Sequence, residues 1–155
     1  MAPARKKRRV GDLMNPSVVC VPSGATVAEA QKLLAERAVS GAPVVDVRGR
    51  PIGVISQSDL ARHQSSRTTA GDAGRFYTDV EDYRDLLSLP VDRSTAPVDE
   101  VMSPRVFSVT RDTGVAAAAN VMRERRIHRL LVTESGVLVG VVSAFDLLRV
   151  VEELG

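Results

Sequence analysis

The chain has 155 residues, of which 44% are hydrophobic and 3% are aromatic. This suits one compact domain or two half-size units that share a core, and it disfavours a stacking surface for single-stranded nucleic acid. The formal net charge of +2 includes the basic run Arg5 to Arg9, so the rest of the chain has an excess of acidic residues, which argues against general polyanion binding.

Residues 1–9 form a basic segment that precedes any periodic pattern, and we predict a solvated, flexible arm. A contact with nucleic acid or an anionic membrane, or an import signal, is the alternative role. The sequence contains no apolar run long enough to span a membrane and no apolar segment of a signal peptide after the arm. The single cysteine, Cys20, cannot form an intramolecular disulfide. These features predict a cytoplasmic protein without membrane association.

An internal repeat starts at Met14-Asn15-Pro16 and recurs as Met102-Ser103-Pro104, at an offset of 88 residues. Runs rich in β-branched residues follow at 18–21 and 106–109, and each predicts a short strand. Both runs lead through a polar turn to a stretch with helical periodicity. The repeated unit therefore begins with a strand and a helix.

The two predicted helices differ in how they start. Thr26 and Glu29 form the pattern of a capping box in the first copy, whereas Asp112 or Gly114 must supply the cap in the second. Apolar residues recur at helical spacing along one face of each helix. These residues are Val27, Ala30, Leu33, Leu34 and Ala38 in the first copy, and Val115, Ala118, Val121 and Met122 in the second.

A second strand (42–45 and 130–132), a glycine-containing turn and a third strand (52–55 and 137–142) come next, and each copy ends in a helix. The offset shortens to 87 across the turn, where a deletion does little harm. The order is therefore strand, helix, strand, strand, helix. Neither unit of about 50 residues can bury both faces of a small sheet alone. We predict an α/β (α+β) fold in which units 10–62 and 98–155 pack about a pseudo-twofold axis.

One seven-residue phrase marks the junction between the third strand and the last helix of each unit. It reads Gly53-Val54-Ile55-Ser56-Gln57-Ser58-Asp59 in the first unit and Gly140-Val141-Val142-Ser143-Ala144-Phe145-Asp146 in the second. A hydroxyl followed by a carboxylate at the start of a helix could hold a ribose and its phosphate. The alternative is purely structural, because serine is a favoured helix cap and acidic residues are favoured in the first helical turn.

Residues 63–97 join the two units and hold three of the five aromatic residues of the chain. We expect a disordered first half and a docked, partly helical second half that contains Phe76, Tyr77, Tyr83, Leu86 and Leu87. These apolar residues either pack on their own repeat pair or contact a second copy or another partner.

The repeat as a whole resembles the tandem CBS domain family, whose paired form is called a Bateman module. The resemblance rests on Asp12-x-Met14-x-Pro16 and Glu100-x-Met102-x-Pro104, on Ala42-Pro43-Val44-Val45-Asp46, and on both Gly-x-x-Ser-x-x-Asp phrases. It implies two clefts between the units that take adenine nucleotides or adenosine derivatives, such as AMP, ADP, ATP or S-adenosylmethionine. It also implies a homodimer, and no required cofactor.

The resemblance assigns roles to residues of both clefts. Asp59 and Asp146 would bond ribose hydroxyls, and Ser56 and Ser143 would contact phosphate or ribose. The adenine would lie against apolar strand residues, namely Val18, Pro43, Val106 and Leu131.

A basic pair distinguishes the second unit from the first. Ile127-His128-Arg129-Leu130 resembles a His-Arg-Leu stretch in the regulatory γ subunit of AMP-activated protein kinase, where the basic residues face phosphates. His128 and Arg129 are therefore candidate phosphate contacts, whereas the first unit has Ser40-Gly41 at the same place. The two clefts should therefore differ in how well they tolerate a charged phosphate. The alternative is a surface basic pair that stabilises the carbonyls at a helix end.

These observations favour a non-catalytic regulatory module that binds an adenosine-containing small molecule and signals through a dimer or an effector protein that the sequence does not identify. The alternative is a structural interaction module with unoccupied clefts, which uses the linker aromatics or the basic arm. An enzyme is disfavoured, because the chain has two histidines, no nucleophile elbow, no His/Cys metal set and no Walker-type loop.

Overall fold

The computed structural model describes residues 8–64, 76–77 and 93–154. The first unit contains the helices and strands α1 (Val10–Leu13), β1 (Val21–Pro22), α2 (Val27–Glu36), β2 (Gly41–Val45), β3 (Pro51–Ser56) and α3 (Gln57–Gln64). The second contains the 3₁₀ helix η1 (Val98–Glu100), β4 (Ser108–Thr110), α6 (Val115–Arg125), β5 (Arg129–Glu134), β6 (Val137–Ser143) and α7 (Ala144–Leu154).

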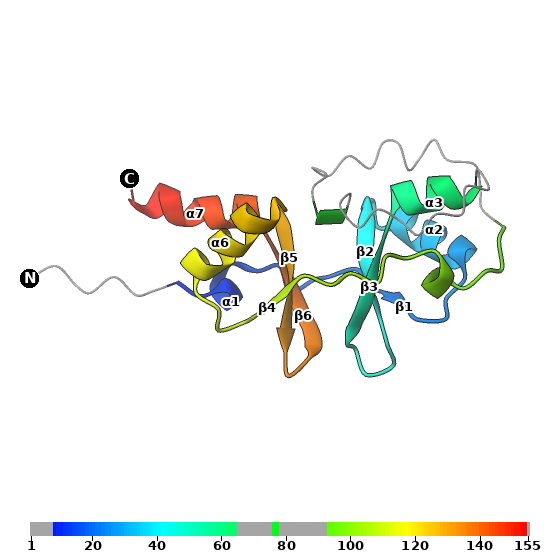
Figure 1. The fold of residues 1–155 in the computed structure, drawn as a ribbon, viewed down its shortest axis with the longest axis horizontal. Coiled ribbons are helices and arrows are strands. Elements are labelled where there is room, and N and C mark those ends of the chain that lie inside the picture. The colour runs from blue at the N-terminus through cyan, green and yellow to red at the C-terminus, as the bar shows by residue number, and fades with distance from the viewer. Residues whose placement is uncertain (1–7, 65–75, 78–92, 155) are drawn as a thin grey trace, which may run out of the picture.

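Two three-stranded sheets confirm the predicted mixed α/β architecture. Their orders are β1-β2-β3 and β4-β5-β6, with the first pair parallel and the second pair antiparallel in each sheet. The register shifts at Val44/Val45 and at Val132/Thr133, which are equivalent positions of the repeat. The sheets face each other in the middle of the molecule, and the longer helices cover their outer sides (Figure 1).

The helix starts follow the local sequence. Thr26 caps α2 and forms the predicted capping box with Glu29, while Gly114 is the N-cap of α6 without a side-chain bond. Ala38 was expected on the apolar face of the first helix, but α2 ends at Glu36 and Ala38 has a left-handed backbone with φ of 52°. That conformation is not helical, so the prediction was too long by about half a turn.

The first strand of each unit is shorter than the β-branched runs predict. In the second unit the Leu131 N–H donates to the Phe107 carbonyl at 3.0 Å and helps to hold the preceding chain on the sheet. Pro43 occupies the equivalent place in β2 and has no N–H to donate, so β1 starts only at Val21. Residues 18–20 therefore run beside the sheet without joining its ladder.

The segment at the start of each unit crosses to the other unit. Val10 and Gly11 of α1 donate their N–H groups to the carbonyls of Thr113 and Arg111, at 2.8 and 2.9 Å. Further along, Asn15 forms an isolated bridge with Val141.

The second unit makes the equivalent contact with the first unit. Ser103 forms a bridge with Val54, and these two positions are the repeat equivalents of Asn15 and Val141. Because equivalent residues exchange equivalent contacts, the two units are related by a twofold operation, as the repeat predicts.

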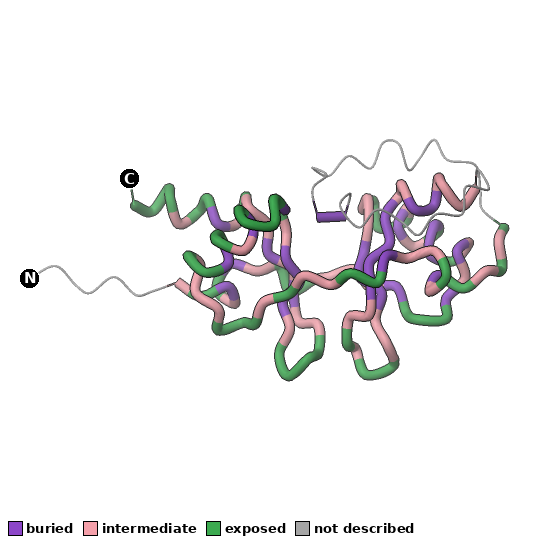
Figure 2. The backbone as a smooth tube through the Cα atoms, viewed as in Figure 1, coloured by how far each residue is buried: buried purple, intermediate pink, exposed green. Residues whose placement is uncertain are grey.

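The crossing segments also join the opposite cores. Val10 and Leu13 belong to the apolar cluster of the second unit, whereas Val98 belongs to that of the first. Buried residues are concentrated in the sheets and on the sides of the helices that pack against the sheets (Figure 2). Neither unit completes its core without a segment from the other.

The predicted flexible arm is wrong for its last two residues. Arg8 forms a salt bridge with Glu153, and an Arg9 side-chain N–H donates to the Asp112 carbonyl at 3.0 Å. Arg9 also forms an isolated bridge with Gly114. These contacts fix the end of the arm on the second unit, and residues 1–7 lie outside the described part.

Two of the five apolar residues expected to dock from the linker are described, and both are helical and buried. Phe76 and Tyr77 are 4% and 0% exposed and belong to the core cluster of the second unit. The sequence left open whether the linker residues pack on their own repeat pair or contact a partner. Phe76 and Tyr77 pack on their own repeat pair. Tyr83, Leu86 and Leu87 lie outside the described residues, so a partner contact through them stays a prediction. No helix among the described residues is long and apolar enough to cross a membrane.

Candidate functional site

The junction between β6 and α7 holds Ser143 and Asp146 in a reciprocal contact. Oδ2 of Asp146 accepts from the Ser143 N–H at 2.8 Å and from its hydroxyl at 3.0 Å, and the Asp146 N–H donates to the Ser143 hydroxyl at 3.1 Å. This contact caps α7, so the structural alternative for the repeated phrase is correct as a local description. The contact uses only Oδ2, one of the two carboxylate oxygens of Asp146.

The equivalent junction between β3 and α3 has the same cap but a different environment. Oδ2 of Asp59 accepts from the Ser56 N–H and hydroxyl at 2.8 and 3.1 Å. Its second oxygen, Oδ1, lies 3.4 Å from Nη2 of Arg62, and Asp59 is only 2% exposed. Asp146 is partly exposed, and among the described residues no hydrogen bond reaches its Oδ1. The carboxylate of the second unit is therefore the more accessible.

A cleft of about 760 Å³ lies between the two units and includes this accessible carboxylate. It brings together six of the ten predicted site residues: Val18, Pro43, His128, Arg129, Ser143 and Asp146. Among these six, the first unit contributes the apolar Val18 and Pro43, and the second unit contributes the four polar residues. The cleft is therefore built from residues of both units.

Charge is distributed unevenly in this cleft. Asp146 is the single carboxylate among the described lining residues, and His128 and Arg129 are the basic ones. The Arg129 guanidinium lies 5.2 Å from the centre of the Phe76 ring, which fits a cation–π contact. Arg126, rather than the basic pair, is the C-cap residue of α6. Both residues of the basic pair line the cleft.

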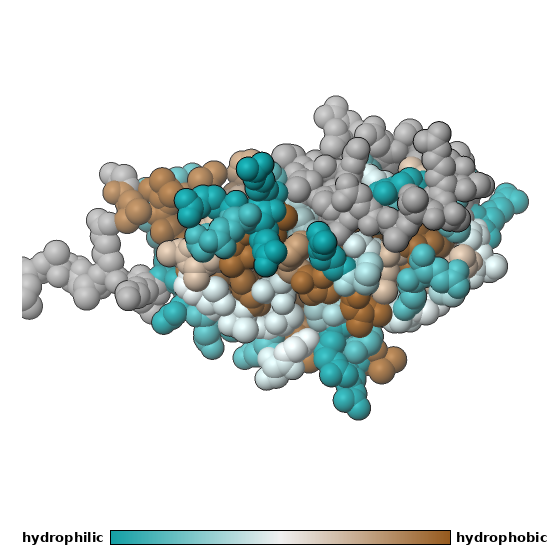
Figure 3. All heavy atoms as spheres, viewed as in Figure 1, coloured by the Kyte–Doolittle hydropathy of each residue, from teal (hydrophilic) through white to brown (hydrophobic). Residues whose placement is uncertain are grey.

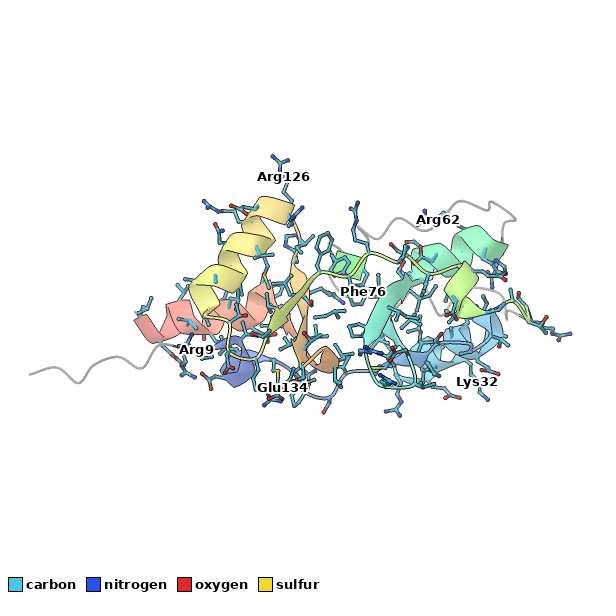
Figure 4. All side chains as sticks on the ribbon, turned by 60° about the horizontal axis from the view of Figure 1, so that its bottom comes forward. Arg9, Lys32, Arg62, Phe76, Arg126 and Glu134 are labelled. Carbon is cyan, nitrogen blue, oxygen red and sulfur yellow. The ribbon has the colours of Figure 1, made fainter. Side chains whose placement is uncertain are left out.

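Sequence reasoning missed several lining residues, of which Phe76 is the most informative. Figure 4 shows Phe76 between the two units. A Cβ on Gly41 would lie 3.0 Å from Cδ2 of Phe76 and 2.9 Å from the Ile55 carbonyl oxygen, so only glycine leaves room for this ring. The aromatic content of the linker was the available signal. The other missed residues are Asn15, Ser17, Val19, Val39, Val141, Ala144, Phe145 and Leu148.

The remaining four predicted residues, Ser56, Asp59, Val106 and Leu131, do not line this cleft. Val106 and Leu131 pack in the cluster that contains Tyr77. The Tyr77 hydroxyl donates to the Arg105 carbonyl and accepts from the Phe107 N–H, both at 3.0 Å. Burial raises the pKa of Tyr77 to about 12, because the ionised phenolate would lose its hydration.

The described residues contain no group of three His, Cys, Asp or Glu side chains that could hold a metal ion. Burial raises the pKa of the Cys20 thiol, which disfavours the reactive thiolate. The cleft instead offers an apolar wall, a carboxylate for vicinal hydroxyls and a basic pair for an anion. Those groups suit recognition of a ligand that has an aromatic base, a sugar and a phosphate.

Several known proteins are similar to this chain in sequence. YhcV of Bacillus subtilis, a CBS domain-containing protein, is 31% identical over 138 residues, which cover 89% of this chain and 81% of YhcV. CBSX2 of Arabidopsis thaliana is 28% identical over 147 residues, or 90% of this chain and 62% of CBSX2. The chain spans 39% of the length of a relative from Methanocaldococcus jannaschii.

Two solved structures are similar in fold and sequence. A crystal structure of CBSX2 in complex with AMP has a TM-score of 0.67 at 26% identity, covering 94% of this chain and 97% of that one. The cytosolic domain of the Mg²⁺ channel MgtE in complex with ATP has a TM-score of 0.64 at 30% identity, covering 92% and 48%. The CBS domain family itself matches residues 10–66 and 98–153, which is most of the chain. The chain therefore belongs to the CBS domain family and carries a tandem pair of CBS domains.

Proposed function

We propose that this CBS pair is a non-catalytic regulatory module that binds an adenine nucleotide or another adenosine derivative in the cleft between its units. One observation carries the proposal: an accessible carboxylate, a basic pair and an apolar wall converge in one cleft of about 760 Å³. CBSX2 was crystallised with AMP and MgtE with ATP, which supports this ligand class. AMP, ADP, ATP and S-adenosylmethionine are the candidate ligands.

The chemistry of the lining residues suggests how such a ligand would lie. The adenine would pack against Val18 and Pro43, and the Oδ1 of Asp146 would accept from the ribose hydroxyls. The phosphate would meet Arg129 and His128, where a charge-assisted hydrogen bond is strongest in a partly dry cleft.

Binding would couple the two units, because Val18 and Pro43 come from the first unit, whereas Asp146 and the basic pair come from the second. A ligand that contacts both stabilises the arrangement in which the cleft is formed, which is a shift in population. The signal would then pass to a second copy or to an effector protein. This mechanism requires no bond to be made or broken.

The first prediction is a thermal shift caused by AMP. A ligand at a hundred times its Kd stabilises the native state by about 2.7 kcal/mol, which should raise Tm by roughly 5–10 °C in a chain of this size. Differential scanning fluorimetry with millimolar AMP, ADP, ATP and S-adenosylmethionine measures the shift, and GMP at the same concentration is the control for base specificity. Equal midpoints with and without all four ligands would favour the interaction module with empty clefts.

The surface of α7 suggests that the signal passes through a homodimer. Phe145, Leu148, Val151 and Leu154 are between 51% and 70% exposed and form an apolar stripe along this helix. Apolar side chains gather over α7 in Figure 3. A groove of about 640 Å³ between α6 and α7 lies beside the stripe. A ridge next to a groove on one face is self-complementary, so a second copy related by a twofold axis would fit it.

The second prediction tests this interface with Val151→Glu. A charge in the apolar stripe should weaken dimerisation at least tenfold, because the carboxylate would lose its hydration in the interface. Analytical ultracentrifugation over a concentration series measures the dissociation constant. Gln64→Glu is the matched control, since Gln64 is the repeat equivalent on α3 and lies outside the stripe. An unchanged association constant for Val151→Glu would exclude α7 as the dimer contact.

A further inference from the structure

The repeat predicts two clefts, but Tyr77 fills the position where the second one should open. We infer that Tyr77 is a built-in occupant of the second cleft, so that the chain binds one adenosine-containing ligand and not two. This inference rests on the proposed function, because it concerns the twin of the proposed binding site. It is carried by the contacts of the Tyr77 hydroxyl, by the burial of the ring and by the state of Asp59.

The Tyr77 hydroxyl makes two hydrogen bonds to the backbone of the second unit. It donates to the carbonyl of Arg105 and accepts from the N–H of Phe107, both at 3.0 Å. The repeat offset of 88 residues maps these groups onto the carbonyl of Ser17 and the N–H of Val19. Ser17 and Val19 line the open cleft. The hydroxyl therefore bonds the second-unit counterparts of backbone groups that belong to two residues lining the open cleft.

A backbone carbonyl and an N–H two residues later form a donor and acceptor pair that matches the edge of adenine. The amino group of adenine donates a hydrogen bond, and the adjacent ring nitrogen accepts one. A tyrosine hydroxyl also donates one hydrogen bond and accepts another. Tyr77 thus satisfies in the second cleft the same two backbone groups that an adenine would satisfy.

The Tyr77 ring is also fully enclosed. It is 0% exposed and packs edge-to-face on the Phe107 ring, with centroids 4.9 Å apart. Its backbone carbonyl accepts from the His128 N–H at 2.7 Å. A nucleotide could enter only by removing this ring, which would expose apolar surface and leave the Arg105 and Phe107 backbone groups without their partner.

Asp59 points to the same conclusion from the ribose end of the second cleft. Its Oδ2 holds the cap of α3 and its Oδ1 lies 3.4 Å from Arg62, a contact that Asp146 lacks among the described residues. The side chain is 2% exposed. The carboxylate that would bind a ribose is therefore engaged within the protein.

The neighbouring residue explains how one short segment serves both clefts. Phe76 lines the open cleft while Tyr77 fills the closed one, and their rings lie 4.9 Å apart in an edge-to-face contact. The smaller Val19 of the first unit stands at the repeat position of Phe107, which leaves the open cleft less filled. The asymmetry between the units is thus built into the sequence.

Titration calorimetry with AMP tests the inference through stoichiometry. Wild-type protein should bind one AMP, Tyr77→Ala should bind two, and Tyr77→Phe should bind one because the ring still fills the cleft. One site in both wild type and folded Tyr77→Ala, or two sites in wild type, would overturn the inference while leaving the proposed function intact. Binding only in Tyr77→Ala would support Tyr77 as the occupant of the second cleft, but it would overturn the open cleft as a binding site and with it the stoichiometry of one. No binding in either protein would overturn both.

Amide hydrogen exchange provides a test that needs neither ligand nor the alanine variant. In Tyr77→Phe the Phe107 N–H loses its acceptor, so its exchange should accelerate at least tenfold relative to wild type. The Leu131 N–H, which donates to the Phe107 carbonyl, is the internal control and should keep its protection. Equal protection of the Phe107 amide in both proteins would show that the hydroxyl does not hold this position, and the inference would fall.

Discussion

Asp146→Ala should weaken AMP binding about 100-fold, whereas the protein should remain folded. Each hydrogen bond between a carboxylate and a ribose hydroxyl contributes about 1.5–3 kcal/mol, and losing this acceptor corresponds to about 2.7 kcal/mol. Titration calorimetry measures the affinity. The variant also loses the Ser143 contacts at the start of α7, which should reduce the free energy of unfolding by about 1 kcal/mol.

A modified ligand separates a ribose contact from a general disturbance of the cleft. 2′-Deoxy-AMP lacks one of the two hydroxyls that Asp146 would accept from, so wild-type protein should bind it about tenfold more weakly than AMP. The Asp146→Ala variant should bind both ligands equally. A coupling of this kind is evidence for a direct contact, because an indirect effect would weaken both ligands by the same factor.

Glu152→Ala is the matched control for charge. Glu152 lies on the same helix, is exposed, and does not line the cleft, so this variant removes an equal charge and should keep the wild-type affinity. If Asp146→Ala keeps that affinity as well, the ribose assignment is wrong. If both variants lose affinity for AMP to the same extent, the loss comes from the change in net charge.

The repeat made most of the fold predictable. The matches at Met14 and Met102, and at the two Gly-x-x-Ser-x-x-Asp phrases, predicted the element order that the two sheets show. Hydrophobic periodicity and the Thr26 cap placed the helices to within a few residues. Local patterns of this kind depend on neighbours in the chain, which a sequence displays directly.

The asymmetry of the clefts could not be predicted in the same way. Asp59 and Asp146 occupy equivalent positions of the repeat, but Arg62 contacts Asp59, and Tyr77 packs in the core cluster of the second unit. Such contacts join residues that are distant in sequence, and the linker has no counterpart in the repeat. The crossing of α1 to the second unit was hidden for the same reason.

The glycine that opens each repeated phrase should be far less tolerant of substitution than its position on a strand suggests. A Cβ on Gly53 would lie 2.5 Å from the Ser103 carbonyl oxygen and 2.7 Å from Sδ of Met102. Ser103 is held there by two hydrogen bonds with Val54, of 2.8 and 2.9 Å, so the backbone cannot move aside without breaking the bridge. Gly53→Ala should therefore destabilise the fold by about 3 kcal/mol, at the upper end of overpacking effects. Urea unfolding followed by circular dichroism measures this loss.

Gly140→Ala should cost less, about 1–2 kcal/mol, although Gly140 is the repeat equivalent of Gly53. Here the nearest atom is Sδ of Met14 at 2.6 Å, which is part of a flexible side chain, and the Asn15 carbonyl oxygen lies farther away at 3.0 Å. Gly114→Ala is the control and should change stability by less than about 0.5 kcal/mol, since no atom lies within 4 Å of the added Cβ.

Double variants locate the cause of each loss. Met14→Ala should relieve part of the Gly140→Ala penalty, because it removes the atom that the new methyl group meets first. Met102→Ala should not relieve Gly53→Ala, because the Ser103 carbonyl remains in place. If Gly53→Ala is as stable as Gly114→Ala, the crossing segments do not pack as closely as described. The opposite ranking, with Gly140→Ala the more damaging, would mean that the backbone bridge at Ser103 yields more easily than the methionine at the other crossing.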